Sequence, residues 1–320
     1  MENDNSSMHL QIQKHIEIKG KEGHKISKIL SEVAKEFEVR DHIRKLKKIQ
    51  VFVTKDPVKV CERIITPKTK LKVHGEMREW ICNNAPSFSY WGMDDVSTIM
   101  LSANQDIFKK KNYNAIKGLF AHELMHLLAK VDGLDEALDE QIAKATKNIL
   151  IYLEKHKEVK PFTKERLFVS LVRVTTTASL LTKDVLVNSR AMSFGFDREI
   201  YENYKATLTD VKNWIKYKES DIIAALKKDE KHVLDDAFLT YLGLNVGWIT
   251  FKMFHNMWYK ELQYMASIQV PQIIRRNCKP ILNEMLNLRF ASKEKNIAKI
   301  LRLTQQNYFN TVQYFCKKLR

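Results

Sequence analysis

The stretch from Ala115 to Val131 reads AIKGLFAHELMHLLAKV, and the expected fold can be built outward from it. Apolar residues recur on every side of a helix drawn through this stretch, which is typical of a helix inside a protein. Its centre nevertheless carries His122, Glu123 and His126, which are costly to bury without partners. Because the two histidines are separated by one helical turn, their imidazoles fall on the same face of the helix. This spacing predicts two nitrogen ligands of a tetrahedral zinc ion, with Glu123 beside the open coordination position.

The run His122-Glu-Leu-Met-His126 is an H-E-x-x-H motif, and through it the chain resembles the zincin metallopeptidases. The resemblance implies a Zn²⁺ cofactor, a peptide or protein substrate, and Glu123 as the general base that activates a zinc-bound water. It also implies a small sheet that precedes the motif helix and packs on it. From the residues alone, the alternative is a core helix with two histidines hydrogen-bonded to backbone and an exposed glutamate.

A catalytic zinc ion usually has three protein ligands and one water, and two segments compete to supply the third ligand. Asp184 and Asn188 lie one turn apart on an otherwise apolar predicted helix. They resemble the arrangement of the gluzincin subset, in which a later helix carries a ligand glutamate and then an aspartate that hydrogen-bonds a ligand histidine. The resemblance implies that Asp184 binds the metal and that Asn188 fixes a histidine tautomer. Asp139 and Glu140, in the helix after the motif, are the alternative, with Glu140 the runner-up, although acidic residues in a first turn are commonly solvated.

The sequence predicts an α+β fold, with a small mixed sheet packed on the motif helix and a mainly helical second half. Alternating or β-branched patterns predict strands at Leu10–Ile18, Ile49–Thr54, Ser97–Ser102 and, more weakly, Lys70–Val73. Helical spacing predicts helices at Ile26–Phe37, Leu134–Leu153, Arg166–Ala191, Asp197–Tyr217, Asp221–Leu226, Leu234–Tyr264, Val270–Leu288 and Lys293–Leu319, and a short helix or turn at Glu76–Cys82. We expect a division into residues 1–160, containing the motif helix, and residues 161–320, supplying the third ligand. Ser97–Ser102 is either an edge strand that offers itself to an extended peptide, as the resemblance suggests, or an ordinary interior strand.

Composition favours a soluble globular protein, since 44% of the residues are hydrophobic and 29% are charged. The four cysteines are widely separated, which argues against a thiolate metal site and a disulfide framework. The polar start MENDNSSMHLQ lacks the order of a secretory signal, so we expect a cytoplasmic protein. The most apolar run, Ala237 to Phe254, is interrupted by Asn245 and Lys252, and we interpret it as a buried or groove-lining helix rather than a membrane span.

The expected function is zinc-dependent hydrolysis of peptide bonds, with Arg190, His232 and Tyr241 as candidates to stabilise the oxyanion. Two other functions remain open. The first is a zinc-binding protein without peptidase activity. The second is a helical protein that binds nucleic acid, because the net charge is +16 and Pro271–Arg320 holds eleven Lys or Arg against two Glu. A generally basic, solvated helical surface explains this charge more simply, so nucleic acid is the less favoured partner.

Overall fold

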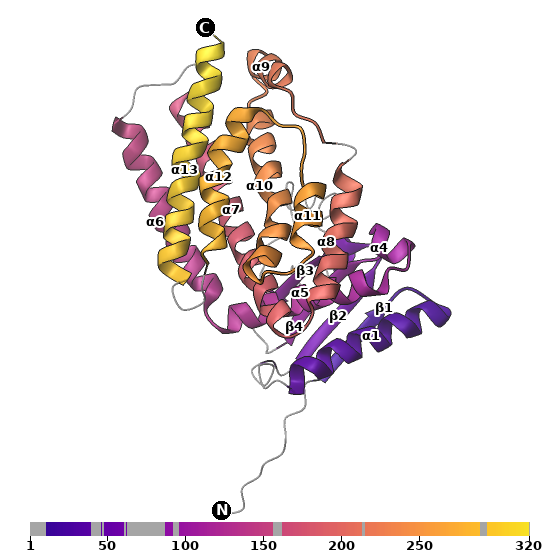
Figure 1. The fold of residues 1–320 in the computed structure, drawn as a ribbon. Helices are drawn as coiled ribbons and strands as arrows, with labels where there is room; N and C mark the ends of the chain where they lie inside the picture. The colour runs from indigo at the N-terminus through magenta and orange to yellow at the C-terminus, as the bar shows by residue number, and fades with distance from the viewer. Residues whose placement is uncertain are drawn as a thin grey trace, which may run out of the picture. The chain divides into compact units, whose positions relative to one another are not determined.

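The computed structural model describes residues 11–39, 46, 48–60, 62, 87–91, 96–155, 162–212, 215–288 and 293–319. The chain forms two compact units, which are described separately. The first unit comprises Met1–Gly133 and Ala191–Ala206, and the second comprises Leu134–Arg190 and Thr207–Arg320. This partition differs from the division at residue 160 expected from the sequence, because each unit is built from two separate stretches of chain. The predicted α+β class is confirmed, since one mixed sheet precedes a chain that is otherwise helical (Figure 1).

The first unit contains a four-stranded sheet in the order β1-β2-β4-β3. The strands are β1 (Gln11–Ile16), β2 (Lys48–Thr54), β3 (Ser87–Trp91) and β4 (Val96–Ser102). β2 pairs in parallel with β1 and with β4, with Lys48 opposite Gln11 and Val96, whereas β3 runs antiparallel to β4. β4 is therefore paired on both sides, and its residues from Ser97 to Ser102 are all buried. The expectation that Ser97–Ser102 offers a free edge to a peptide is wrong, and the interior alternative is confirmed.

Two helices of the first unit pack beside this sheet. α1 (Gly20–Val39) connects the parallel strands β1 and β2, and it contacts β1 and α5 (Tyr113–Val131). α5 in turn contacts β3 and β4, and the short helix α4 (Asp106–Lys109) precedes it. Phe37 of α1 is completely buried and stacks on Phe196, with ring centroids 5.1 Å apart. The motif helix therefore belongs to the core of this unit, as the sequence predicts.

The described residues of the second unit are mainly helical, and an isolated bridge pairs Lys216 with Gln269. α12 contacts both α10 and α13, and α13 also contacts α6. Two helices contribute residues to both units, α7 at its C-terminal end and α8 at its N-terminal end. The helices are α6 (Leu134–Lys155), α7 (Lys164–Ser193), α8 (Asp197–Lys212), α9 (Glu219–Lys227), α10 (His232–Met253), α11 (Tyr259–Met265), α12 (Gln272–Leu286) and α13 (Lys293–Lys318).

The helix predicted for Leu234–Tyr264 is wrong in one respect, because the chain breaks between α10 and α11. His255 adopts a φ of +51°, in the left-handed region that ends a helix, and the N–H of Asn256 donates to the carbonyl of Phe251. β3 and α4 were not predicted from the sequence. The elements expected at Lys70–Val73 and Glu76–Cys82 fall outside the described residues.

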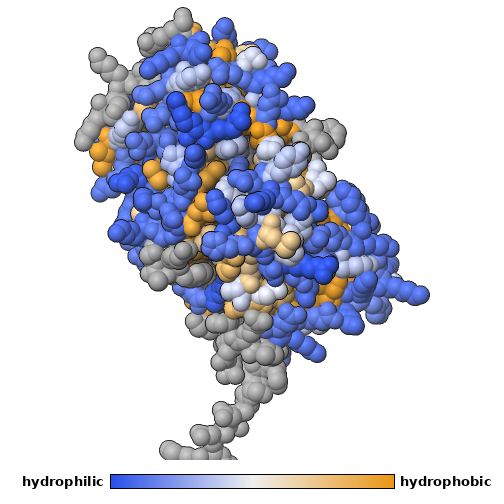
Figure 2. Space-filling model, viewed as in Figure 1, coloured by the Kyte–Doolittle hydropathy of each residue, from blue (hydrophilic) through white to orange (hydrophobic). Residues whose placement is uncertain are grey.

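None of the described helices is both long enough and apolar enough to cross a membrane, in agreement with the interpretation of Ala237–Phe254. That segment forms most of α10, whose Phe238, Val246, Ile249 and Phe251 are buried. The described surface shown in Figure 2 is predominantly hydrophilic, with hydrophobic residues scattered over it.

Candidate metal centre

The motif helix α5 has a defined start and end. The side-chain oxygen of Asn112 accepts a hydrogen bond from the N–H of Ala115 at 3.1 Å, which satisfies one of the free donors in the first turn. At the other end, Gly133 adopts a φ of +73°, a conformation that glycine reaches without steric cost. Twelve residues between these ends are buried, including Phe120, Leu124 and Met125. The prediction of a buried helix is confirmed.

Close backbone contact fixes α5 against the first turn of α8. A Cβ atom placed on Gly118 would lie 2.1 Å from the carbonyl oxygen of Glu199, so only glycine allows this approach. Next to it, the Lys117 ammonium lies 3.4 Å from carboxylate oxygens of both Glu199 and Glu36, and the latter pair links α5 to α1.

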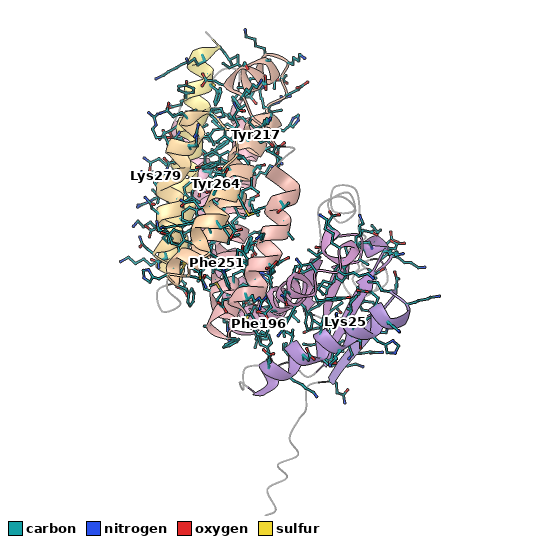
Figure 3. All side chains as sticks on the ribbon, turned by 45° about the vertical axis from the view of Figure 1, so that its right-hand side comes forward. Lys25, Phe196, Tyr217, Phe251, Tyr264 and Lys279 are labelled. Carbon is teal, nitrogen blue, oxygen red and sulfur yellow. The ribbon has the colours of Figure 1, made fainter. Side chains whose placement is uncertain are left out.

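A second set of contacts joins the N-terminal end of α5 to α1. The Tyr113 hydroxyl donates to Glu22 at 2.9 Å, which together with Lys111 lowers the pKa of that carboxyl group. The Lys25 ammonium lies 3.6 Å from the centre of the Tyr113 ring, in a cation–π contact. Figure 3 labels Lys25, on α1, and Phe196, which directly precedes α8. These contacts hold the helix that carries the motif in a fixed rotation.

His122 and His126 face each other along α5. Their Nε2 atoms are 3.0 Å apart, and the rings are almost perpendicular, with centroids 4.5 Å apart and an interplanar angle of 87°. Two imidazole ligands at about 2.0–2.1 Å from a tetrahedral zinc ion have their nitrogen atoms about 3.3 Å apart. The two nitrogens therefore have nearly the separation that one ion requires. Both side chains are half-buried, which leaves an approach for an ion.

Glu123 is only 4% exposed, although it neighbours the half-buried His122 on the same helix. The alternative of an ordinary core helix requires this glutamate to be exposed, and that requirement is not met. A carboxylate buried in an apolar helix is costly unless it has a partner such as a cation. Its burial is the feature that separates this helix from one with a chance motif on a solvated face.

Asp184 and Asn188 lie on α7, as the sequence predicts. Asp184 is half-buried and Asn188 is 1% exposed, among the buried residues Val185, Leu186 and Val187. Together with His122 and His126, Asp184 would give a metal ion two nitrogen ligands and one carboxylate ligand. Two imidazole nitrogens and a carboxylate oxygen form a donor set that suits zinc and other divalent transition metals.

The rival ligands on α6 are directed elsewhere. Asp139 and Glu140 are both exposed, and the Glu140 carboxylate pairs with Lys144 at 2.5 Å. Asp135 pairs with Lys183 of α7, also at 2.5 Å. Glu140 and Asp135 therefore act in ion pairs typical of helix surfaces and of helix–helix contacts, which weakens the case for Glu140 as a ligand.

The three oxyanion candidates have different surroundings within the second unit. His232 is exposed in the first turn of α10, and Arg190 is half-buried near the end of α7. Tyr241 lines a cavity together with Trp248 and Arg275. This cavity was not predicted from the sequence. The only signal for it in the sequence is the excess of basic residues after Pro271, which includes Arg275.

Comparison with family models, with curated proteins and with solved structures found no match. Function is therefore inferred from the residues and the geometry of this chain.

Proposed function

We propose that His122, His126 and Asp184 bind a zinc ion and that the protein is a zinc-dependent metallopeptidase. The observation that carries the proposal is the 3.0 Å separation of the two Nε2 atoms on a buried helix. Side chains that share one ion must converge in this way, and without an ion the same two nitrogens can share one hydrogen bond. Asp184 is preferred as third ligand because it is half-buried on α7, whereas Glu140 is exposed and pairs with Lys144.

The donor set supports zinc over the harder divalent cations. Imidazole nitrogen is a common ligand of zinc and rare for Ca²⁺ and Mg²⁺, which prefer oxygen. Three protein ligands also leave a fourth tetrahedral position for water, as in catalytic rather than structural zinc sites. The same set suits Fe(II), so the identity of the metal is an outcome of the first experiment.

Glu123 supplies the acid–base chemistry in this proposal. A bound zinc ion would lower the pKa of its water and polarise a substrate carbonyl. The Glu123 carboxylate, adjacent in sequence to a ligand, would take a proton from that water and return it to the leaving amine. Its burial excludes bulk water, which strengthens electrostatic interactions at the carboxylate.

A zinc-binding protein without peptidase activity is the second candidate, and it requires the same ligands without the same use of Glu123. The two candidates therefore make the same prediction for metal binding and opposite predictions for hydrolysis. Chelator-sensitive cleavage of casein or of a quenched peptide library, by the same preparation that contains metal, favours the peptidase.

Metal analysis of the purified protein tests the shared part of the proposal. The wild-type protein is expected to contain about one equivalent of zinc per chain, and His122→Ala is expected to lose it. His24→Ala is a matched control, because His24 lies exposed on α1 and its Nδ1 pairs with the carbonyl of Gly20. Failure of the wild-type protein to bind zinc, even after zinc is added to folded protein, would overturn the proposal.

A further inference from the structure

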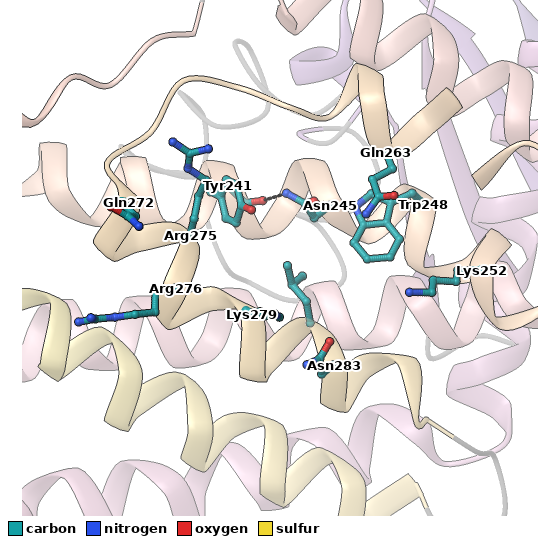
Figure 4. Close-up of a pocket in the computed structure, with 11 residues that line it drawn as sticks. Tyr241, Asn245, Trp248, Lys252, Gln263, Gln272, Arg275, Arg276, Lys279 and Asn283 are labelled. Carbon is teal, nitrogen blue, oxygen red and sulfur yellow. Dashed lines mark hydrogen bonds between the residues drawn. The ribbon is translucent and has the colours of Figure 1, made fainter. Parts of the chain in front are cut away.

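The helical unit contains a second feature that the metal centre does not use, a cavity of about 670 Å³ lined by α10, α11 and α12 (Figure 4). Its volume lies in the range of about 300–1,000 Å³ that small-molecule sites occupy. The lining residues are Tyr241, Asn245, Trp248, Lys252, Gln263, Gln272, Arg275, Arg276, Lys279, Leu282 and Asn283.

The lining carries positive charge without compensation. Four of its residues, Lys252, Arg275, Arg276 and Lys279, are cations, and the lining includes no carboxylate. Among the residues that the structure describes, none of the four pairs with an acidic side chain. Some surface cations of this unit have such partners, as in the pairs Lys299–Glu284 and Arg166–Asp229, and others, such as Lys227 and Lys295, have none among the described residues. All four are exposed, and the Lys252 ammonium lies 5.6 Å from the centre of the Trp248 ring. An anion bound in the cavity would be attracted by all four charges.

The N-terminal end of α12 adds to the positive electrostatic potential at the cavity. Its first turn begins at Gln272 after Pro271, contains no acidic residue and has no side-chain cap. The N-terminal end of a helix carries a partial positive charge. Arg275 and Arg276 therefore add positive charge close to an end that is already positive. Free N–H groups and arginines at one helix end form a favourable environment for phosphate oxygens.

The opposite wall is held by its own hydrogen bonds. The Trp248 indole N–H donates to the side-chain oxygen of Asn245 at 2.6 Å, and the Asn245 amide donates to the carbonyl of Tyr241 at 2.7 Å. Figure 4 shows Arg275 beside the Tyr241 ring and Gln263 beside Trp248. Burial raises the pKa of Tyr241, so its hydroxyl group remains protonated at neutral pH and is available as a donor. This wall is amphipathic and preformed.

We propose that the cavity binds a small organic anion that carries two or more phosphate groups and is about the size of a nucleotide. The number of unpaired cations calls for more than one negative charge. The mixture of amides, Tyr241 and Trp248 provides donors and apolar surface for the organic part of the ligand. The four charges lie around one cavity, which favours a compact ligand over the extended backbone of a nucleic acid.

Isothermal titration calorimetry at about 0.15 M salt, a concentration that screens weak surface attraction, tests this proposal. The probes are ATP, tripolyphosphate, inorganic phosphate and a single-stranded oligonucleotide. The double variant Arg275→Gln/Lys279→Gln removes two cations of the cavity. Lys227→Gln/Lys295→Gln removes the same charge from exposed positions of α9 and α13, as the matched control. Circular dichroism confirms that both double variants remain folded.

ATP and tripolyphosphate are expected to bind at least tenfold more tightly than inorganic phosphate. The cavity variant is expected to weaken them by roughly tenfold or more, whereas the control changes them by less than about threefold. Equal losses in both double variants, or binding of the oligonucleotide alone, would overturn the proposal. Failure of every polyphosphate probe to bind more tightly than inorganic phosphate would also overturn it.

Discussion

The hydroxyl group of Tyr308 donates a hydrogen bond to a carboxylate oxygen of Asp235, and this contact joins α13 to α10 inside the helical unit. Ser170 of α7 donates to the other carboxylate oxygen at 3.1 Å, and Arg173 lies 3.6 Å from it. Asp235 is 4% exposed. Burial raises the pKa of this carboxyl group, and the hydrogen bonds from Tyr308 and Ser170 oppose the shift only in part.

A pH-dependent contribution to stability follows from Asp235. Its pKa in the folded protein lies above the value of about 3.9 expected in the unfolded chain. The protonated Asp235 carboxyl group therefore favours the folded state. This contribution to the free energy of unfolding is fully present below the unfolded pKa and is lost as the pH rises through the folded pKa. Asp235→Asn keeps an acceptor for Tyr308 but cannot ionise, so the difference in unfolding free energy between variant and wild type should shift in favour of the variant with rising pH.

Urea unfolding between about pH 4 and pH 8 measures this difference, with Asp236→Asn as control. Asp236 is more exposed than Asp235 and pairs with Arg173 at 2.7 Å. The control substitution therefore removes the same charge from a carboxylate that is not buried. A difference for Asp235→Asn that stays constant over the pH range would contradict the prediction.

Gly118→Ala should destabilise the protein by about 1–3 kcal/mol, the usual cost of inserting a methyl group where no space exists. The new Cβ atom would meet the backbone oxygen of Glu199 at 2.1 Å, and neither helix can yield without moving the other. Gly243→Ala, within α10, is the matched control, because its Cβ atom would meet only a Leu181 methyl group at 3.8 Å.

The control should stabilise the protein by about 0.5–1 kcal/mol, since alanine loses less backbone entropy than glycine in a helix. Thermal unfolding of the two variants beside wild type measures both effects. The prediction for Gly118 does not hold if both substitutions change the unfolding temperature in the same direction and by a similar amount.

Substitutions of the third ligand should separate the two acidic candidates. Asp184→Ala is expected to weaken zinc binding by more than the roughly 10–100-fold typical of an outer-shell partner, and Asn188→Ala by an amount within that range. Glu140→Ala should leave affinity nearly unchanged, because Glu140 is exposed and pairs with Lys144. Competition with a chromophoric chelator measures the affinities. A large loss with Glu140→Ala and none with Asp184→Ala would reverse the assignment.

Glu123→Gln is expected to retain zinc and to lose peptidase activity. The substitution preserves the shape of the side chain and removes the base, for which a loss of about 10²–10⁴-fold in turnover is typical. Parallel assays of metal content and hydrolysis are required, because loss of both would indicate a structural defect. Wild-type turnover in the metal-loaded variant would eliminate Glu123 as the general base.

Most of the fold could be predicted because periodicity is a local property of the sequence. Ala115–Val131 and Ile49–Thr54 lie within α5 and β2, which differ from them by at most two residues at either end. The break at His255 could not be predicted, because the apolar residues that flank it continue the helical pattern. The order of strands was also inaccessible, since pairing of β4 with β3 on one side and β2 on the other depends on distant segments.

The candidate centre could be predicted in part for the same reason. The histidine pair is encoded within one turn, so spacing alone predicts that the two rings face each other. The role of Gly118 could not be foreseen, because its partner at Glu199 is remote in the chain. The basic cavity was missed because Lys252 and Arg275 come from different helices, and only their packing brings the charges together.

The division of the chain has a consequence for its synthesis. Residues 191–206 belong to the first unit, although the 57 residues from Leu134 to Arg190 intervene before them. A ribosome that has released only the first 133 residues has therefore not yet supplied Phe196, which covers Phe37, or the first turn of α8, which lies against Gly118. The first unit of the nascent chain therefore keeps part of its core exposed until α7 and the residues of α8 up to Ala206 have emerged. A chaperone that protects apolar surface during this interval would have the exposed faces of α1 and α5 to bind.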